Sequence, residues 1–401
     1  MLDVDPVYIA QTLIIATVLY LACRQANRML RIQVIAWALG VTAIALQYGV
    51  GNQLNFYSND QQYYNGILEI LKSWNWPSNE PVTLAWWFDY SKFPYPLAAV
   101  PLSIAGINPE LAMKTVSLIC LLALSNEVLR RYGSMSLRDQ AIAVYLTGCG
   151  LIGTFFSLIA LRETMMMYFV YRYATDRSIV LRITSISIVF LLRAHLAAAL
   201  IVAELALAVW NWLTKRRKLG FAELPLLLVG GVTLGYTMFT WQFSTSQGVS
   251  SLRNIQTPFN GTLGISGTIQ IASNFAGLQF LTAHEAFVRL SISELLWLRL
   301  IFSDTLIVPL SFSVVCVLAA HRLSNRHKFT VLTFAIYVSI VTNTDFNSFR
   351  QNIPLMPLMG MVILDFLKDR KLQKSSAPED VSRASDSSRR AVRHSVSNVA
   401  N

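Results

Sequence analysis

Ionisable and aromatic side chains stand at the borders of this chain's apolar segments, where charges are costly unless they face a cavity or pair with one another. A carboxylate can take a proton from a reacting hydroxyl, and the planar guanidinium of arginine binds phosphate oxygens through two parallel hydrogen bonds. The side chains that combine these properties are Asp60, Tyr63, Tyr64, Arg162, Glu163, Arg193, His195 and Arg350. Arginines from several distant segments would suit a pyrophosphate, whose charge needs such donors.

Asp60 is the first candidate for the carboxylate that takes a proton beside a bound pyrophosphate. It lies in the run Asn59-Asp60-Gln61-Gln62-Tyr63-Tyr64, just after the second apolar segment. We expect Asp60 to act as a general base or to orient an acceptor, with Tyr63 and Tyr64 binding substrate. The alternative is that Asp60 is a solvated loop acid, or the N-cap of a helix over Tyr63–Lys72.

Arg162 and Glu163 are neighbours at the junction of two apolar segments. We expect Arg162 to bind a phosphate, and Glu163, the second candidate acid, to orient an acceptor or a partner arginine. The alternative is that the two side chains pair with each other, or that either pairs with a nearby helix.

Arg193 and His195 lie between apolar residues, and Arg350 precedes the last apolar segment. We expect all three to bind substrate, the arginines through phosphate. A lone histidine on an apolar helix is more often a hydrogen-bonded structural residue. The alternative for Arg350 is that it anchors the chain in the membrane, with its charged head at the interface.

A membrane-embedded structure must position these residues. Of the 401 residues 54% are hydrophobic and 14% are charged, and the apolar runs approach the roughly 20 residues that cross a bilayer. This composition excludes a soluble multidomain protein. The formal net charge of +11 falls largely in short clusters beside the apolar runs, where it orients helices next to anionic lipid, so we expect no nucleic-acid partner.

Basic clusters mark every second loop and therefore predict the topology. They lie at residues 24–31, 130–138, 172–182, 215–218, 322–328 and 368–371, which the positive-inside rule places in the cytoplasm. We expect an all-α polytopic membrane bundle of about eleven transmembrane helices, with the N-terminus outside and the C-terminus in the cytoplasm. The crossings are predicted near 7–23, 32–50, 109–128, 140–160, 163–176, 180–194, 196–213, 224–242, 304–320, 329–343 and 353–367.

The rest of the chain divides into outer loops and a tail. The membrane domain is expected over residues 1–371, with outer loops at about 51–96 and 243–303, and 372–401 as a disordered cytoplasmic tail. Short interfacial helices are predicted over Phe275–Leu290 and Ile292–Phe302, and Leu97–Ile107 is too short to cross. Aromatic residues crowd the first outer loop, which suits either a membrane interface or sugar binding.

The sequence predicts no cofactor. The four cysteines lack the spacing of a zinc or disulfide framework, and the chain has no phosphate-binding loop, dinucleotide motif or zinc-protease motif. Phosphate-binding arginines together with a proton-accepting acid are expected for glycosyl transfer from a polyprenyl-diphosphate sugar, which needs no nucleotide site.

At these residues the chain resembles integral-membrane glycosyltransferases of the GT-C superfamily, and among them the EpsG-like and Wzy-like polysaccharide polymerases. The resemblance rests on Arg24, on Gly51 followed by Asp60 and Tyr64, on Arg162-Glu163, and on Arg350-Gln-Asn-Ile-Pro354. It implies sugar transfer on an undecaprenyl carrier at the outer face of a bacterial inner membrane, with other polysaccharide-assembly proteins and membrane lipid as partners. The first outer loop has no Asp-x-Asp or Glu-Asp pair, so a divalent cation is not supported.

Two other functions fit a polytopic chain with buried charges. A secondary transporter or flippase of an anionic or lipid-linked substrate would have broken helices in two related halves and acids near the bilayer midplane. A scaffold subunit needs no reactive site. The ionisable groups of this chain crowd toward one face, which favours the enzyme.

Overall fold

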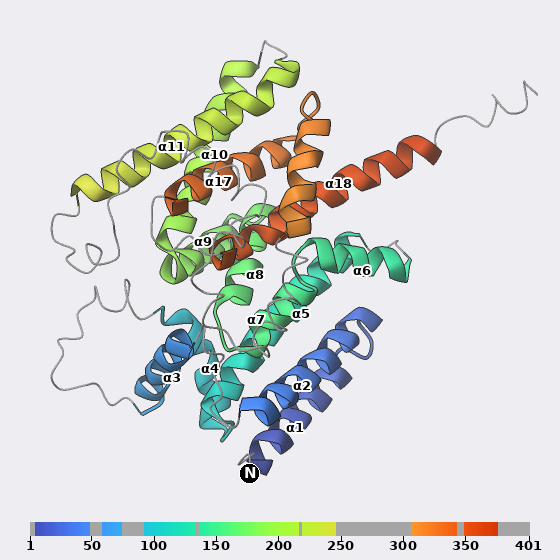
Figure 1. Ribbon diagram of the computed structural model, residues 1–401, viewed down its shortest axis with the longest axis vertical. Coiled ribbons are helices and arrows are strands. Elements are labelled where there is room, and N and C mark those ends of the chain that lie inside the picture. The colour runs from blue at the N-terminus through green and yellow to red at the C-terminus, as the bar shows by residue number, and fades with distance from the viewer. Residues whose placement is uncertain are drawn as a thin grey trace, which may run out of the picture.

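Helices form where the sequence has apolar runs, and turns of polar residues and glycine separate them. The computed structural model describes residues 5–48, 58–73, 92–132, 136–215, 219–245, 306–342 and 349–375, and these ranges contain helices and turns but no strand. Figure 1 shows the helices arranged along the long axis of the molecule, with the N-terminal helices at one end.

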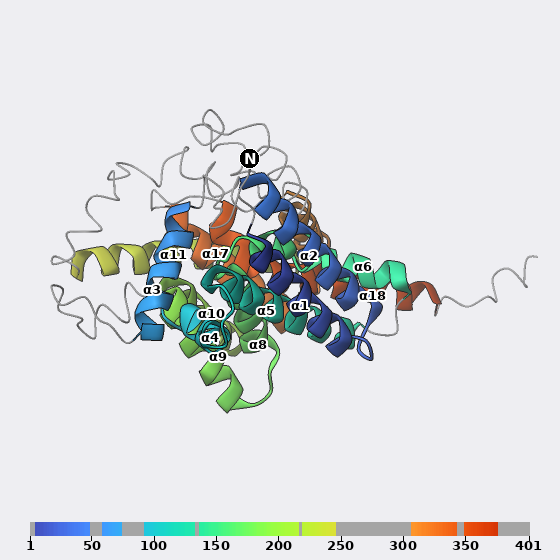
Figure 2. The same cartoon turned by 90° about the horizontal axis from the view of Figure 1, so that it is seen from below.

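The described residues between 5 and 132 contain five helices, of which α1 and α2 pack side by side against α5 (Figures 1 and 2). Their bounds are α1 Pro6–Ala22, α2 Arg28–Tyr48, α3 Ser58–Ser73, α4 Pro94–Ile104 and α5 Pro109–Arg131. Helix α5 begins sharply because the Asn108 side chain accepts hydrogen bonds from the first free N–H groups and Pro109 occupies the first helical position.

The following helices continue from the centre of the molecule to its other end. The first four are α6 Leu137–Leu146, α7 Leu151–Leu158, α8 Glu163–Thr175 and α9 Ile179–Leu192. The others are α10 Ala194–Thr214, η2 Gly220–Ala222, α11 Glu223–Thr245, a helix at Leu306–Leu318, α17 Asn325–Thr342, η3 Phe349–Leu355 and α18 Met356–Ser375. Helix α8 lies in the middle and contacts α5, α9, η3 and α18.

Several helices could span a membrane. By length and composition, the described residues contain four such helices, or up to five if α6 and α7, which meet at 60°, are one bent span. The four are Arg28–Gln47, Pro109–Arg131, Ala194–Thr214 and Gly220–Met238. Each predicted crossing overlaps a helix, but α1, α9 and Leu306–Leu318 have only 10–17 residues, so eleven crossings and their direction stay predictions.

Three predicted boundaries need correction. Helix α3 begins at Ser58, five residues before the expected start, so Asp60 lies in its first turn and is not an N-cap at Tyr63. Helix α18 continues to Ser375 and so includes the first residues of the predicted tail. Leu97–Ile107 falls mostly in the short helix α4. The predicted helices Phe275–Leu290 and Ile292–Phe302, and the tail after 375, lie outside the described residues.

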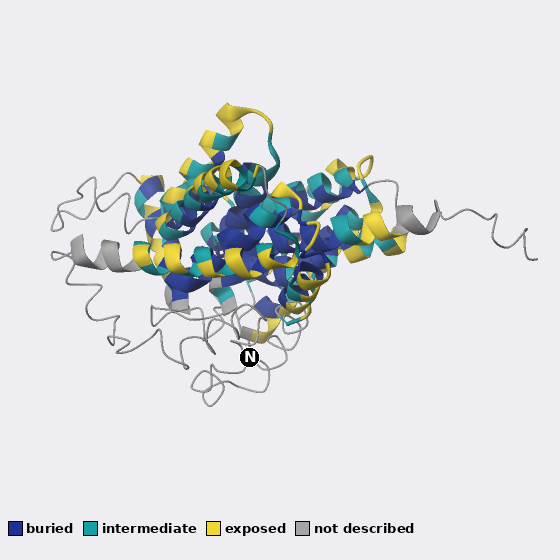
Figure 3. Ribbon diagram, turned by 90° about the horizontal axis from the view of Figure 1, so that it is seen from above, coloured by how far each residue is buried: buried dark blue, intermediate teal, exposed yellow. Residues whose placement is uncertain are grey.

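Buried residues gather in the middle of the helix assembly, and exposed apolar residues face outward (Figure 3). Close helix contacts use small residues, as is common in membrane bundles. At the crossing of α18 with the end of α6, a Cβ added to Gly360 would overlap the carbonyl oxygen of Leu146 and lie 2.6 Å from the Cα of Thr147. This crossing fixes α18, and with it the η3 segment that carries Arg350.

We predict that Gly360→Ala destabilises the protein by about 1–3 kcal/mol, because the added methyl group meets backbone that cannot move aside. Thermal unfolding of the full chain in detergent measures the effect. The matched control is Gly230→Ala in α11, where an added Cβ has nothing within 4 Å, so its Tm should stay equal or rise slightly. Equal melting of both variants would contradict the close crossing.

Candidate functional site

The candidate site is built on a break between α7 and α8. Helix α7 ends at Leu158 and α8 begins at Glu163. Within the break Ala160 has a φ of +51°, a left-handed conformation that is strained for a residue with a Cβ. Strain of this kind persists only where the surroundings enforce it, and it clusters at functional sites. The turn brings Arg162 and Glu163 into the interior of the bundle.

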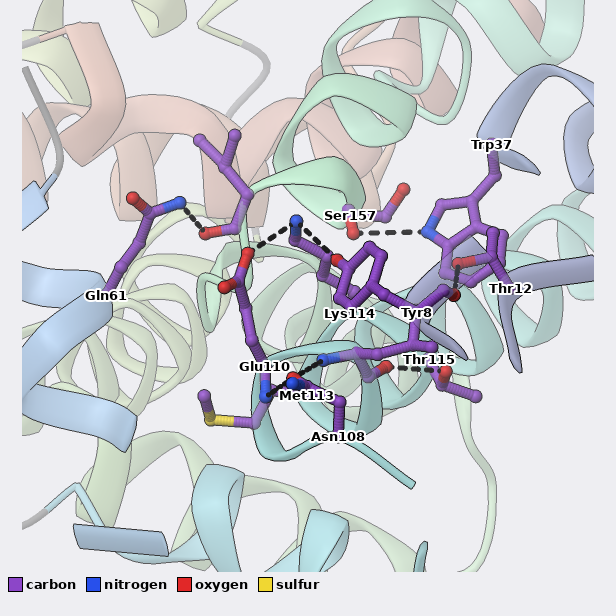
Figure 4. Close-up of polar contacts among 12 residues, drawn as sticks. Tyr8, Thr12, Trp37, Gln61, Asn108, Glu110, Met113, Lys114, Thr115 and Ser157 are labelled. Carbon is purple, nitrogen blue, oxygen red and sulfur yellow. Dashed lines mark hydrogen bonds and ion pairs between the residues drawn. The ribbon is translucent and has the colours of Figure 1, made fainter. Parts of the chain in front are cut away.

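Side chains from three other helices donate hydrogen bonds to the carbonyl groups of this break. A helix end leaves its last carbonyls without partners, and buried carbonyls need them. The bonds run from Trp37 Nε1 to Ser157 O (3.2 Å), from Gln61 Nε2 to Ile159 O (2.7 Å) and from Ser117 Oγ to Leu161 O (3.0 Å). Figure 4 shows the first two of these bonds. Helices α2, α3 and α5 thus hold the break in place.

Glu163 is the centre of the site. Its side chain is 0% exposed, and its Oε1 lies 2.5 Å from Arg350 Nε and 3.6 Å from Arg193 Nη2. Arg193, at the junction of α9 and α10, is buried as well. Glu163 therefore pairs with two arginines, one at the end of α9 and one in η3, and this pairing fits both the role of orienting a partner arginine and the alternative of pairing with a nearby helix. Pairing of Glu163 with its neighbour Arg162 is not what the structure shows.

Asp60 forms the open side of the same cluster. It accepts a hydrogen bond from Arg350 Nη1, and its side chain is 47% exposed, against 11% for Arg350. Arg350 therefore bridges a buried acid and an accessible acid. The alternative in which Arg350 extends to the membrane interface as an anchor is wrong, because its guanidinium points inward between the two carboxylates.

Arg162 is the group that the cluster does not satisfy. Its Nε and Nη1 atoms are buried and have no hydrogen-bond partner among the described residues. Burial of the guanidinium lowers the pKa of Arg162 from its ordinary value, but arginine stays protonated in proteins. Among the described residues the cluster therefore holds three arginines and two carboxylates, an excess of one positive charge.

Further unsatisfied polar atoms lie beside Arg162. Glu163 Oε2, Thr164 Oγ1 and Gln61 Oε1 are buried without a hydrogen-bond partner within the described part of the chain. Such atoms are rare in folded proteins and call for an explanation such as a bound water, ion or ligand. The donors of Arg162 and these acceptors together suit a bound group that both accepts and donates hydrogen bonds, such as water or a ligand that carries hydroxyl groups.

His195 and Tyr337 form one wall of the site. Their rings stack at 5.7 Å with an interplanar angle of 7°, and Tyr337 Oη accepts a hydrogen bond of 3.1 Å from Arg193 Nη1. Tyr337 was not predicted from the sequence. Its phenol lies inside an otherwise apolar run of α17, and a buried tyrosine hydroxyl usually has a polar partner, so this pattern could have identified it.

The two tyrosines after Asp60 have different positions. Tyr64 is buried and meets Tyr95 edge to face at 5.4 Å, and Tyr95 shares a hydrogen bond of 2.9 Å with Ser117. Tyr63 is 41% exposed and contacts Tyr64 edge to face at 5.8 Å. Of the predicted pair, Tyr64 therefore belongs to the buried shell of the site and Tyr63 lies on its outside.

Within the described ranges, no group of three or more His, Cys, Asp or Glu side chains could hold a metal ion. Comparisons of the chain with protein families, with curated proteins and with solved structures found no match.

We predict that the two acids of the site differ strongly in their contribution to stability. Glu163→Gln keeps the shape but removes the buried charge that two arginines share, and breaking such a pair costs about 3–5 kcal/mol. Asp60→Asn, with a half-exposed side chain, should cost about 1 kcal/mol or less. Thermal unfolding in detergent compares the two variants. A larger loss in Asp60→Asn would show that Glu163 is not the centre of the cluster.

Proposed function

We propose that this chain is a GT-C-like integral-membrane glycosyltransferase of the polysaccharide-polymerase kind, which takes sugars from a polyprenyl-diphosphate donor. The observation that carries the proposal is the guanidinium of Arg162 beside Arg193 and Arg350, because its buried Nε and Nη1 have no hydrogen-bond partner among the described residues. These arginines come from three separate parts of the chain. An anion with several oxygens would relieve the excess charge and satisfy the free donors.

The diphosphate of the donor fits the character of this cluster. Its negative charge grows as the bond to the sugar breaks, so fixed guanidinium groups stabilise the transition state more than the ground state. Arg162 is the proposed primary contact because its Nε–H and Nη1–H groups are free. Arg193 and Arg350 are held by Glu163 and would approach the same phosphate from the other side.

Asp60 is the proposed general base, because it is the accessible acid of the pair. An acceptor hydroxyl oxygen attacks the anomeric carbon of the donor sugar, and the bond from that carbon to the diphosphate oxygen breaks. The polyprenyl diphosphate leaves with the bonding electrons, and Asp60 takes the proton of the hydroxyl. Glu163 is too enclosed for this role and is proposed as the residue that positions the two arginines.

The proposal places this reaction at the outer face of a bacterial inner membrane, in a bundle of about eleven crossings. A flippase or transporter of the same lipid-linked substrate would use the same phosphate site but would make no glycosidic bond. Analysis of the products therefore separates the two functions: an enzyme lengthens the saccharide, whereas a transporter returns it unchanged.

We predict that Arg162→Met abolishes sugar transfer without weakening the protein. Removing a buried, uncompensated cation should leave Tm unchanged or higher in the absence of ligand. A polyprenyl-diphosphate analogue at about a hundred times its Kd should stabilise the parent by about 2.7 kcal/mol but should not stabilise Arg162→Met. The measurements are thermal unfolding with and without the analogue, and saccharide lengthening by the full chain in lipid nanodiscs.

The matched control for this experiment is Arg177→Gln, which changes an exposed arginine and should behave like the parent. Asp60→Asn should still be stabilised by the analogue but should not lengthen the saccharide, since it keeps the phosphate donors and loses the base. Binding of the analogue by Arg162→Met at the parent's affinity would overturn the proposed phosphate site.

Topology gives an independent prediction. In a variant without its four cysteines, a new cysteine at Ser58 should react with an impermeant thiol reagent in intact cells, because the basic clusters place this end of the bundle outside. A cysteine at Ser324 should react only after lysis. The cysteine-free parent gives the background. Labelling in the opposite order would move Asp60 to the cytoplasm and contradict a reaction at the outer face.

A further inference from the structure

A polar cavity lies at the far end of α18 from the candidate site. Arg350 precedes α18, whereas Phe366, Asp369 and Arg370 near its other end line a cavity of about 280 Å³. The opposite wall is the turn between the helix Leu306–Leu318 and α17, with His321, Arg322 and His327. The volume is several times the ~30 Å³ that one water takes up in the liquid, so a tetrahedral anion fits.

The two arginines of this cavity are exposed at its rim and lie outside the ion pairs of the described residues. Within the described residues neither Arg322 nor Arg370 makes an ion pair, although Arg370 lies over the ring of Phe366 at 4.9 Å. Two nearby basic residues at the start of α17 are paired: Arg326 with Asp365 at 3.2 Å and Lys328 with Glu223 at 2.6 Å. The fold thus neutralises the cations that hold helices together and leaves those of the cavity available.

His327 adds a buried donor or acceptor to the cavity wall. It is 6% exposed, and its Nδ1 has no hydrogen-bond partner in the described part of the chain. A polar atom buried without a partner is rare and costly unless a ligand or water satisfies it. Nδ1 itself is shielded from solvent, so the cationic groups of the pocket that an anion reaches are those of Arg322 and Arg370.

We propose that this cavity binds the phosphate group of an anionic ligand, at the end of the bundle that the basic clusters place in the cytoplasm. Basic pockets between helices at that membrane surface are suited to lipid headgroups, and arginine forks match phosphate oxygens. The ligand is either an anionic phospholipid or a soluble phosphorylated compound. Asp369 is the one acid among the lining residues, and it opposes the anion.

The experiment uses the full chain in a nonionic detergent and measures bound phosphatidylglycerol by native mass spectrometry, with zwitterionic phosphatidylcholine as the comparison. Arg322→Gln and Arg370→Gln should each weaken phosphatidylglycerol binding about tenfold, the effect of losing one charge-assisted hydrogen bond. Asp369→Asn should strengthen binding. Arg138→Gln, at another exposed arginine, is the matched control and should bind as the parent does.

Competition with inorganic phosphate separates the two sources. If phosphate displaces the lipid from the parent but not from the arginine variants, the site takes soluble phosphorylated compounds. If phosphate does not compete, and the arginine variants lose the lipid, the headgroup is the ligand. The proposal is overturned if Arg322→Gln and Arg370→Gln bind as Arg138→Gln does, or if the parent binds both lipids equally.

Discussion

The burial of one carboxylate organises the candidate site. Glu163 is fully enclosed, and an isolated charge there would cost several kcal/mol unless cations and hydrogen bonds compensate it. The compensation comes from Arg193 and Arg350, which are 30 and 187 residues further along the chain. Helix α8, the junction of α9 and α10, and the η3 segment before α18 must therefore meet at this point. The position of Asp60 follows from it, because Arg350 connects the two acids.

Arg162 is informative because several other buried or half-buried cations among the described residues have acidic partners. Lys114, fully buried in α5, lies 2.6 Å from Glu110 and donates to Tyr8 at 3.1 Å (Figure 4). Arg172 and Arg182 each have acidic partners at 3.0 Å or less. A fold that satisfies these cations leaves the buried donors of Arg162 free, beside a backbone turn held by three hydrogen bonds. A strained turn that holds an unused guanidinium would lower the stability of the protein and give no function. A ligand at Arg162 therefore explains the unpaired donors better.

The sequence predicts the helices better than it predicts their contacts. Apolar length places a helix at every expected crossing that the structure describes, because burial of an apolar run depends on local composition. The helix over 58–73 begins earlier than expected, because the apolar pattern indicates only Tyr63–Lys72 and the first turn of the helix is polar. The left-handed Ala160 could not be predicted, since alanine has no preference for that conformation. Its support comes from three helices that are remote in sequence.

The same contrast holds for the site: the sequence predicts which residues belong to it better than it predicts their contacts. Residue type and position at segment borders identified Asp60, Arg162, Glu163, Arg193 and Arg350 as a group, and the structure brings them together. Which acid binds which arginine depends on helix packing, and a separation of 187 residues contains no information about it. Tyr337 was missed because a tyrosine in an apolar span also occurs as simple core packing. Its role is visible only once the hydrogen bond from Arg193 is known.

The pairing of Arg350 with Asp60 also bears on the proposed reaction. In the structure Asp60 accepts a hydrogen bond from this arginine, so its carboxylate is engaged by Arg350. A diphosphate that takes over the Nη1–H of Arg350 would release Asp60 and leave it free to accept a proton, while Glu163 continues to hold Nε. Donor binding would then create the base at the moment when an acceptor is needed. A base that is available only with donor bound limits the time in which water can compete with the acceptor, which is the usual advantage of assembling a site on binding.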